Sequence, residues 1–420
     1  MRNNTGRCKL FFLPLMCLSP NFSYRDFLSY LKQMGYDPLD IHGETTIVFE
    51  EGNRIRIAYL DGIVQACSDS EEPLEKIRKR IITYFLAECR GDPEVVLLLT
   101  DGKQLEAYPD DSLASKLHQK LRGAFSLLIV LLSFIAPILW SLYNPGYLVF
   151  ASLASIFLLF AFLLFSPFFK LAPNCIRIPD DARRVFLVRV ATEDLSDSDL
   201  ILFGVVKHLV IKNIRGLDND KLKNILDEVG IKYSKVLIEE LNLQDILKRL
   251  TMSFKVKTKL CLVPSPKRNA FTVGLVPRWS RIYVTVGLLL DLSQQEFEAV
   301  LAHEFAHIKR HDLLRVFTML GAEYITRTFL LSLFYIPLPL LLSYFLIYTY
   351  AVANFLQRLE YNADKEACKK KYDRSLLRAL IKLEFPALMR SEKLSERLKG
   401  RVLPSSHPPP FNRIMALLQA

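Results

Sequence analysis

The clearest hydrophobic pattern in the chain is a pair of long stretches without a charged residue, 123–169 and 328–357. Such stretches predict membrane segments, because a helix needs about 20 apolar residues to cross a hydrocarbon core of roughly 30 Å. The first stretch is long enough for two crossings, and Asn144-Pro145-Gly146 interrupts it near the middle. We therefore expect a transmembrane helix hairpin at 116–175.

The second stretch is shorter, and Pro337-Leu338-Pro339 lies near its middle, where the chain can turn. Each half has about 15 residues, fewer than a full crossing requires. Either the hairpin is re-entrant, or its first helix begins near Leu313 and includes Glu323 and Arg327, which are spaced to neutralise each other on a helix. We favour a second membrane hairpin at about 313–357.

Shorter patterns outside these stretches predict a mixed fold. Residues 1–115 predict a small α/β accessory domain, in which Ser23 begins a helix, Asp61-Gly62 joins two strands, and 95–100 is a further strand. Residues 10–18 follow three basic residues, as in a secretory signal, but we favour a first β-strand because no small-residue cleavage pattern follows them. Residues 176–258 predict a mixed α/β connecting segment.

The net charge of +11 is explained by where the basic residues lie. They cluster beside the apolar stretches, with Lys116, Lys120 and Arg122 before the first and Lys369–Lys371 after the second. The positive-inside rule produces such clusters and puts both ends of the first hairpin in the cytosol. No nucleic-acid-binding module or aromatic-basic pattern accompanies the charge, so we expect no nucleic-acid partner.

The seven cysteines are scattered along the chain without a close pair. Such spacing gives no disulfide framework and no zinc knuckle. We therefore expect buried or free thiols that face a reducing cytosol.

The candidate chemistry begins at His303-Glu304-Phe305-Ala306-His307, an H-E-x-x-H sequence within a stretch, 293–314, that has no proline or glycine. Residues four apart lie on one face of a helix, so both imidazoles can bind one ion. Glu304 lies beside them and is placed to accept a proton from a zinc-bound water. The motif predicts one catalytic Zn²⁺ per chain, with Glu304 as general base.

A catalytic zinc site needs a third protein ligand and an open position for water. His311 follows on the same helix, but one helix face does not easily wrap three imidazoles around a tetrahedral ion, so we expect it outside the ligand set or exposed. Glu360 is the better third ligand, because Asp364 lies four residues further on and can bind the free ring N–H of a ligating histidine. Glu360 must then return to the membrane side that holds His303, as a hairpin at 313–357 allows.

At this point the sequence resembles a known family, the integral-membrane HtpX-type zinc metallopeptidases, which are related to the zinc-dependent CAAX prenyl endopeptidases. The resemblance covers roughly 260–420 and the preceding membrane hairpin. The matching residues are Asn269-Ala270-Phe271 with Gly274, Val284 to Leu288, Glu298 to Asp312, Glu360 with Asp364, and His407-Pro408 followed by Arg413-Ile414.

The resemblance implies a mainly helical gluzincin-type peptidase domain at 259–420, which makes the whole chain an α+β protein with transmembrane helix hairpins and an N-terminal α/β domain. It implies that His303, His307 and Glu360 bind zinc. It also implies that His407 steadies the oxyanion and that Asn269, beside an edge strand, helps to hold the substrate backbone.

The sequence therefore predicts a multi-pass integral membrane metalloendopeptidase with its active site at the cytosolic face, in contact with the lipid bilayer. Its expected substrates are membrane or membrane-associated proteins. A prenyl-protein endopeptidase is an alternative within the same chemistry, although that group usually has more spans around a large chamber. A catalytically inactive membrane scaffold with structural zinc is an alternative of another class, but a structural site has no use for Glu304.

Overall fold

The structure is a computed structural model, and it describes most of the chain outside one long central segment. The described residues are 7–14, 22–40, 44–88, 94–100, 175–180, 182–192, 218–263, 265, 267–334, 337–391 and 408–419, with 202, 203, 205, 206, 209 and 210 between them. The predicted hairpin at 116–175 lies outside these residues except for its last position, and His407 lies outside them altogether.

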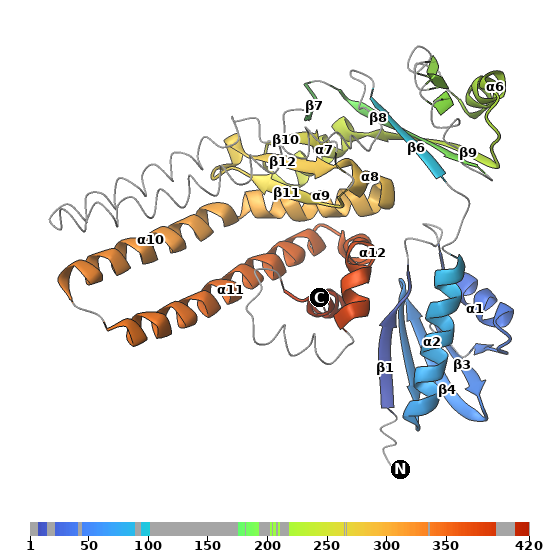
Figure 1. The fold of residues 1–420 in the computed structure, drawn as a ribbon, viewed down its shortest axis with the longest axis horizontal. Helices are drawn as coiled ribbons and strands as arrows, with labels where there is room; N and C mark the ends of the chain where they lie inside the picture. The colour runs from blue at the N-terminus through green and yellow to red at the C-terminus, as the bar shows by residue number, and fades with distance from the viewer. Residues whose placement is uncertain are drawn as a thin grey trace.

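The N-terminal part is a five-stranded antiparallel sheet with two helices (Figure 1). Its elements are β1 Arg7–Phe12, α1 Tyr24–Gln33, β2 Leu39–Asp40, β3 Thr45–Glu50, β4 Asn53–Leu60, β5 Ile63–Ser68 and α2 Glu71–Glu88, and the strand order is β1-β5-β4-β3-β2. Ser23 and Asp26 form a reciprocal cap at the start of α1. Asp61 and Gly62 both have positive φ, as a tight hairpin turn requires. The predicted helix start and hairpin are confirmed. Of the strand predicted at 10–18, residues 10–12 belong to β1, which begins at Arg7, and residues 15–18 lie outside the described residues.

Two pairs of cysteines are joined across strands, which the sequence did not predict. Cys8 and Cys67 lie opposite each other on β1 and β5, with Cα atoms 4.1 Å apart, and form a disulfide. Cys175 and Cys261 form a second one, with Cα atoms 5.6 Å apart. The expectation of unpaired thiols is wrong for these four residues, because strand pairing brings together cysteines that are far apart in the sequence.

A second antiparallel sheet has the order β6-β8-β9, with β6 Glu94–Thr100, β8 Arg184–Ala191 and β9 Lys235–Asn242. α6 Asn219–Val229 packs on it, and residues of both form a separate small hydrophobic core. The strand predicted at 95–100 is present, but it pairs with β8 rather than completing the N-terminal sheet. A local pattern reveals a strand without revealing its partner. The boundaries of the four predicted parts of the chain, 1–115, 116–175, 176–258 and 259–420, remain predictions.

The third sheet forms one side of the functional region. It has the order β11-β12-β10-β7, from β7 Ile176–Ile178, β10 Lys259–Val263, β11 Ala270–Val273 and β12 Arg281–Thr285, so β11 is an edge strand. α7 Leu243–Phe254, the short 3₁₀ helix η4 Pro277–Trp279 and α8 Val286–Asp291 accompany it. Thr285 binds the backbone of Asn269 through both its amide and its hydroxyl, which fixes the start of β11.

Five further helices complete the described chain: α9 Gln294–Lys309, α10 Asp312–Leu333, α11 Leu338–Cys368, α12 Asp373–Ser391 and α14 Pro410–Leu418. α9 lies between the third sheet on one side and α11 and α12 on the other (Figure 1). Lys382 of α12 forms a buried ion pair of 2.7 Å with Glu296 of α9. α9 is therefore held on both sides by packing, as a rigid support for a site requires.

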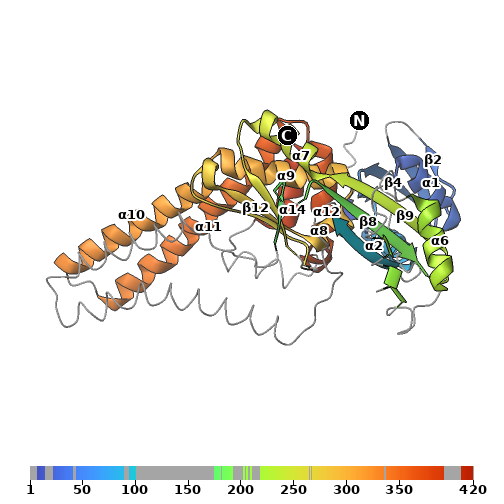
Figure 2. The same cartoon turned by 90° about the horizontal axis from the view of Figure 1, so that it is seen from above.

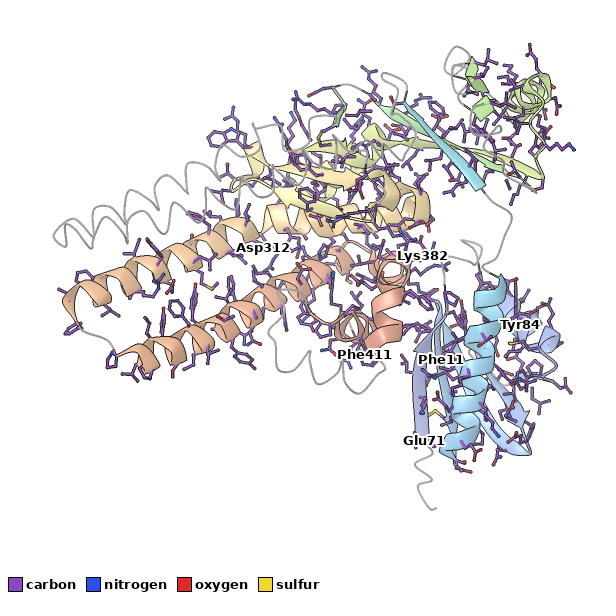
Figure 3. All side chains as sticks on the ribbon, in the orientation of Figure 1. Phe11, Glu71, Tyr84, Asp312, Lys382 and Phe411 are labelled. Carbon is purple, nitrogen blue, oxygen red and sulfur yellow. A yellow bond between two sulfur atoms is a disulfide. The ribbon has the colours of Figure 1, made fainter. Side chains whose placement is uncertain are left out.

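The N-terminal sheet packs against the C-terminal helices and shares one hydrophobic core with them. Phe12 of β1 meets Phe411 of α14 edge to face, with ring centroids 6.2 Å apart. Figure 3 shows Phe11 and Phe411 on the facing sides of these two parts. The accessory part thus lies directly behind the helices that border the site.

α10 and α11 form an antiparallel pair that projects from the body of the molecule (Figures 1 and 2). The chain reverses between Phe334 and Pro337, where the sequence predicted the turn. Large apolar side chains face outward along this pair, with Leu346 75% and Ile347 71% exposed. Among the described residues, Pro339–Cys368 is the helix long and apolar enough to cross a membrane, with a mean hydropathy of 1.5. The hairpin is confirmed, and its membrane crossing remains a prediction.

Candidate metal centre and its cleft

The two histidines of the motif lie on one face of α9. Ser293 and Glu296 form a reciprocal cap at its start, so the helical phase is fixed well before the motif. His303 is buried and His307 is partly exposed, and their ring centroids are 4.7 Å apart. This is the arrangement that the spacing of four residues predicts.

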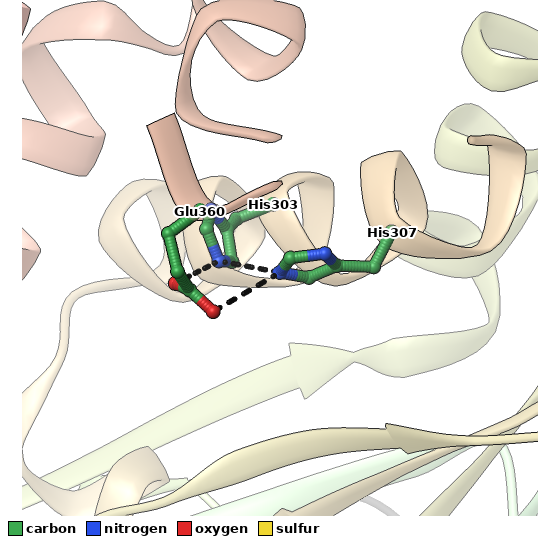
Figure 4. A group of neighbouring side chains, drawn as sticks. All are labelled: His303, His307 and Glu360. Atoms are coloured by element: carbon green, nitrogen blue, oxygen red, sulfur yellow. Dashed lines mark hydrogen bonds and ion pairs between the residues drawn. The ribbon is translucent and has the colours of Figure 1, made fainter. Parts of the chain in front are cut away.

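Glu360 of α11 reaches the same point from the other side of the cleft (Figure 4). Its carboxylate oxygens lie 3.5 Å from Nε2 of His303 and 3.8 Å from Nε2 of His307, and the two Nε2 atoms are 3.1 Å apart. Ligands at about 2.0–2.2 Å around a tetrahedral zinc are separated by about 3.3–3.6 Å. The three side chains therefore have the spacing of ligands around one ion.

The Nδ1 atoms of both rings lie against carboxylates. Nδ1 of His303 is 2.7 Å from Asp364, and Nδ1 of His307 is 2.9 Å from Asp312. With each Nδ1 directed at a carboxylate, both Nε2 atoms are left facing Glu360. The 3.1 Å separation of the two Nε2 atoms requires a proton or a metal cation between them. These two histidines and Glu360 are therefore a group that could hold a metal ion.

Arg413 of α14 holds the carboxylates behind the histidines. It donates two hydrogen bonds to Asp364, of 2.9 Å and 2.7 Å, in the fork geometry of an arginine–carboxylate pair. Its third nitrogen lies 3.6 Å from Glu360. Burial acts to lower the pKa of Arg413, but the hydrogen bonds and charge of Asp364 outweigh it and raise that pKa. Arg413 is therefore a fixed positive charge that orients both acidic residues.

The charge of Asp364 also acts on His303. Burial acts to lower the pKa of the His303 imidazole, but the neighbouring Asp364 and Glu360 carboxylates raise it to about 10. A site that favours positive charge on a buried imidazole this strongly also favours a divalent cation.

Glu304 faces the cleft and is held in place by the sheet. Thr272 of β11 donates a 2.7 Å hydrogen bond from its hydroxyl to a Glu304 carboxylate oxygen. Asn269 is exposed just before the same edge strand and lines the cleft. Glu304 is thus placed between the metal site and the strand beside which a substrate would lie.

The cleft has a volume of about 510 Å³, and its walls come from β11, α9, α10, α11, α12 and α14. Its lining includes both metal-site histidines, Glu304 and Glu360. His311 lies at its edge, exposed, where the chain turns with φ 56° between α9 and α10. His311 is therefore outside the three-ligand group, as expected.

Three residues behind the site were not assigned a role from the sequence: Asp312, Thr272 and Arg413. Asp312 follows His307 by five residues, and the break at His311 turns it back toward the imidazole. A search for acidic residues just past the end of the motif helix would have found it. Thr272 and Arg413 come from β11 and α14, and no local spacing connects them to the site.

The part of the chain that contains these residues is similar in sequence to known peptidases. Residues 238–420 match the model of peptidase family M48. A protease HtpX homolog of Methanocaldococcus jannaschii is 28% identical over 254 residues, which are 52% of this chain and 87% of that protein. One of Pelotomaculum thermopropionicum is 48% identical over 73 residues, but these are only 17% of this chain and 26% of the relative.

Among solved structures, the crystal structure of S. mikatae Ste24p is similar over 72% of this chain and 65% of that one, with a TM-score of 0.41 and 17% identity. That likeness is too slight to define the fold of this chain. Residues 238–420 thus match the model of peptidase family M48, and the chain is similar in sequence to proteases named HtpX homologs.

Proposed function

We propose that this chain is a membrane-embedded zinc metalloendopeptidase that hydrolyses peptide bonds of membrane or membrane-associated proteins. The observation that carries the proposal is the convergence of two Nε2 atoms and one carboxylate within 4.8 Å of one another, beside Glu304. Imidazole nitrogens and a carboxylate, with room left for water, are the ligand set of catalytic zinc. We propose His303, His307 and Glu360 as the ligands of one Zn²⁺.

When bound, zinc would supply an acidic water and polarise the carbonyl of the scissile bond. Glu304 would act as the general base toward the attacking water and would then pass the proton to the leaving amine. Thr272 holds the Glu304 carboxylate at the required place through its hydroxyl. Asp364 and Asp312 keep the two imidazoles oriented and their Nδ1 atoms protonated.

The substrate backbone would lie along β11, which within the described part of the chain pairs with another strand on one side and is open on the other. Asn269, at the start of this strand, is proposed to help hold it. His407 is proposed to donate a hydrogen bond to the developing oxyanion.

The location at a membrane is supported by the outward apolar side chains of α10 and α11. Because these helices leave the body next to Glu360 and His307, the cleft opens at the base of the hairpin. We propose a multi-pass protein whose cleft receives segments near the membrane surface.

The direct test is Glu304→Gln in the full-length protein purified in detergent. The substitution keeps the size of the side chain but removes the base, so we expect unchanged zinc content and a loss of cleavage of about 10²–10⁴-fold. Asp220→Asn, an exposed acid on α6, serves as control and should cleave as wild type does. Unchanged cleavage by Glu304→Gln would refute the assigned base, and preference for a prenylated peptide would favour the prenyl-protein alternative.

A further inference from the structure

One carboxylate in the cleft is not used by the proposed chemistry. Glu384 of α12 lines the cleft together with the metal-site residues. It is half-buried, and within the described part of the chain no hydrogen bond or ion pair engages it. It lies close enough to Arg413 to contribute to the raised pKa of that residue.

The other charges that line the cleft already have partners or roles. Arg268 pairs with Asp291, Arg413 with Asp364, and Asp312 with His307. Glu304 and Glu360 belong to the reaction centre. Glu384 therefore remains as the negative charge that a substrate can neutralise.

The surroundings of Glu384 select the kind of side chain that fits. Leu380 and Leu383 of α12 and Val300 of α9 line the same cleft. Val300 lies one helical turn before Glu304, so this apolar wall adjoins the point of cleavage. An apolar wall with one carboxylate suits a long side chain whose aliphatic stem packs on leucine while its positive end reaches the acid.

We propose that Glu384 is a specificity-determining residue that selects a lysine or arginine next to the scissile bond. The inference rests on the proposed peptidase function and adds a substrate class to it. The selected peptides carry a basic residue on the side of the cleaved bond that faces α12.

The test uses full-length protein in detergent and one peptide sequence in which the residues flanking the cleaved bond are replaced, one at a time, by lysine, methionine or glutamate. At one position, wild type should cleave the lysine peptide with a kcat/KM about tenfold above that of the methionine peptide. Glu384→Gln should bring this ratio close to one. Glu384→Lys should favour the glutamate peptide, and Asp220→Asn should keep the wild-type ratio.

Equilibrium binding of the same peptides to Glu304→Gln, with and without Glu384→Gln, separates this inference from the proposed function. A preference for lysine in binding that disappears with Glu384→Gln supports the inference even if wild type cleaves no peptide, an outcome that would refute the peptidase. A lysine-to-methionine ratio that Glu384→Gln leaves unchanged, or no lysine preference in either measurement, overturns the inference.

Discussion

Each histidine of the metal site is oriented by an acid from a different place in the chain. Asp364, which orients His303, comes from α11, whereas Asp312, which orients His307, comes from the first turn of α10 just past the break at His311. Both acids are buried. The geometry of the site therefore depends on residues that touch neither the metal nor the substrate.

Replacing Asp312 tests this dependence at His307. Asp312→Asn keeps the size of the side chain but removes the charge that favours a protonated Nδ1. We expect zinc affinity to fall by about 10–100-fold, the usual cost of losing such a partner. Competition with a chelator measures it, with Asp220→Asn as the control, and an unchanged affinity would show that Asp312 does not support the ligand.

Replacing Arg413 of α14 also tests whether zinc binding depends on residues that do not touch the metal. Arg413→Lys keeps a positive charge but loses the fork that binds Asp364, and Arg413→Ala loses both. We expect zinc affinity to decrease in the order wild type, Arg413→Lys, Arg413→Ala. The neighbouring exposed Asn412, replaced by alanine, should bind zinc as wild type does. Equal affinities for the three forms at position 413 would contradict the role of the fork.

Among the elements, the α10–α11 hairpin has a polar contact within its apolar length. Glu323 accepts hydrogen bonds of 2.7 Å from Arg327 on the same helix and from the Tyr344 hydroxyl on α11. The Arg327 guanidinium also lies over the Phe345 ring at 5.3 Å. This cluster fixes the two helices relative to each other.

A double-mutant cycle tests that cluster. Glu323→Leu leaves Arg327 unpaired in apolar surroundings, so we expect a loss of about 1–3 kcal/mol in the free energy of unfolding in detergent. Adding Arg327→Leu should restore part of this loss, because no unpaired charge remains. Losses that simply add would show that the two residues act independently.

The buried Tyr59 of the N-terminal sheet should make the free energy of unfolding depend on pH in the alkaline range. Tyr59 is 3% exposed, and burial raises its pKa to about 12, whereas an unfolded tyrosine has a pKa of about 10. Its stabilising contribution is complete below about pH 10 and is lost as the pH rises toward about 12. Between about pH 10 and pH 12, the free energy of unfolding of Tyr59→Phe should fall less than that of wild type, and the difference should reach about 3 kcal/mol. Identical slopes in denaturant titrations would contradict the assignment.

At the scale of the whole molecule, the sequence predicted what depends on local periodicity. The helix of His303 and His307 and the turn before Pro337 each follow from residues within a few positions. The assignment of Glu360 and Asp364 to one site also rested on local spacing, because they lie four residues apart on one helix.

Pairings between distant segments were not predictable in this way. The strand at 94–100 joins β8 rather than the N-terminal sheet, and Cys8 meets Cys67 across 59 residues. Thr272 and Arg413 reach the site from β11 and α14. Tertiary packing decides such contacts, and no spacing within one segment records them.

The central claim is that two helices on opposite sides of a cleft hold one zinc through His303, His307 and Glu360. X-ray absorption at the zinc edge of the purified full-length protein tests it most directly. We predict one zinc per chain, bound by two imidazole nitrogens at about 2.0–2.1 Å and by oxygen ligands, and loss of this signal in Glu360→Ala. Sulfur ligands, or the same spectrum in Glu360→Ala, would contradict it.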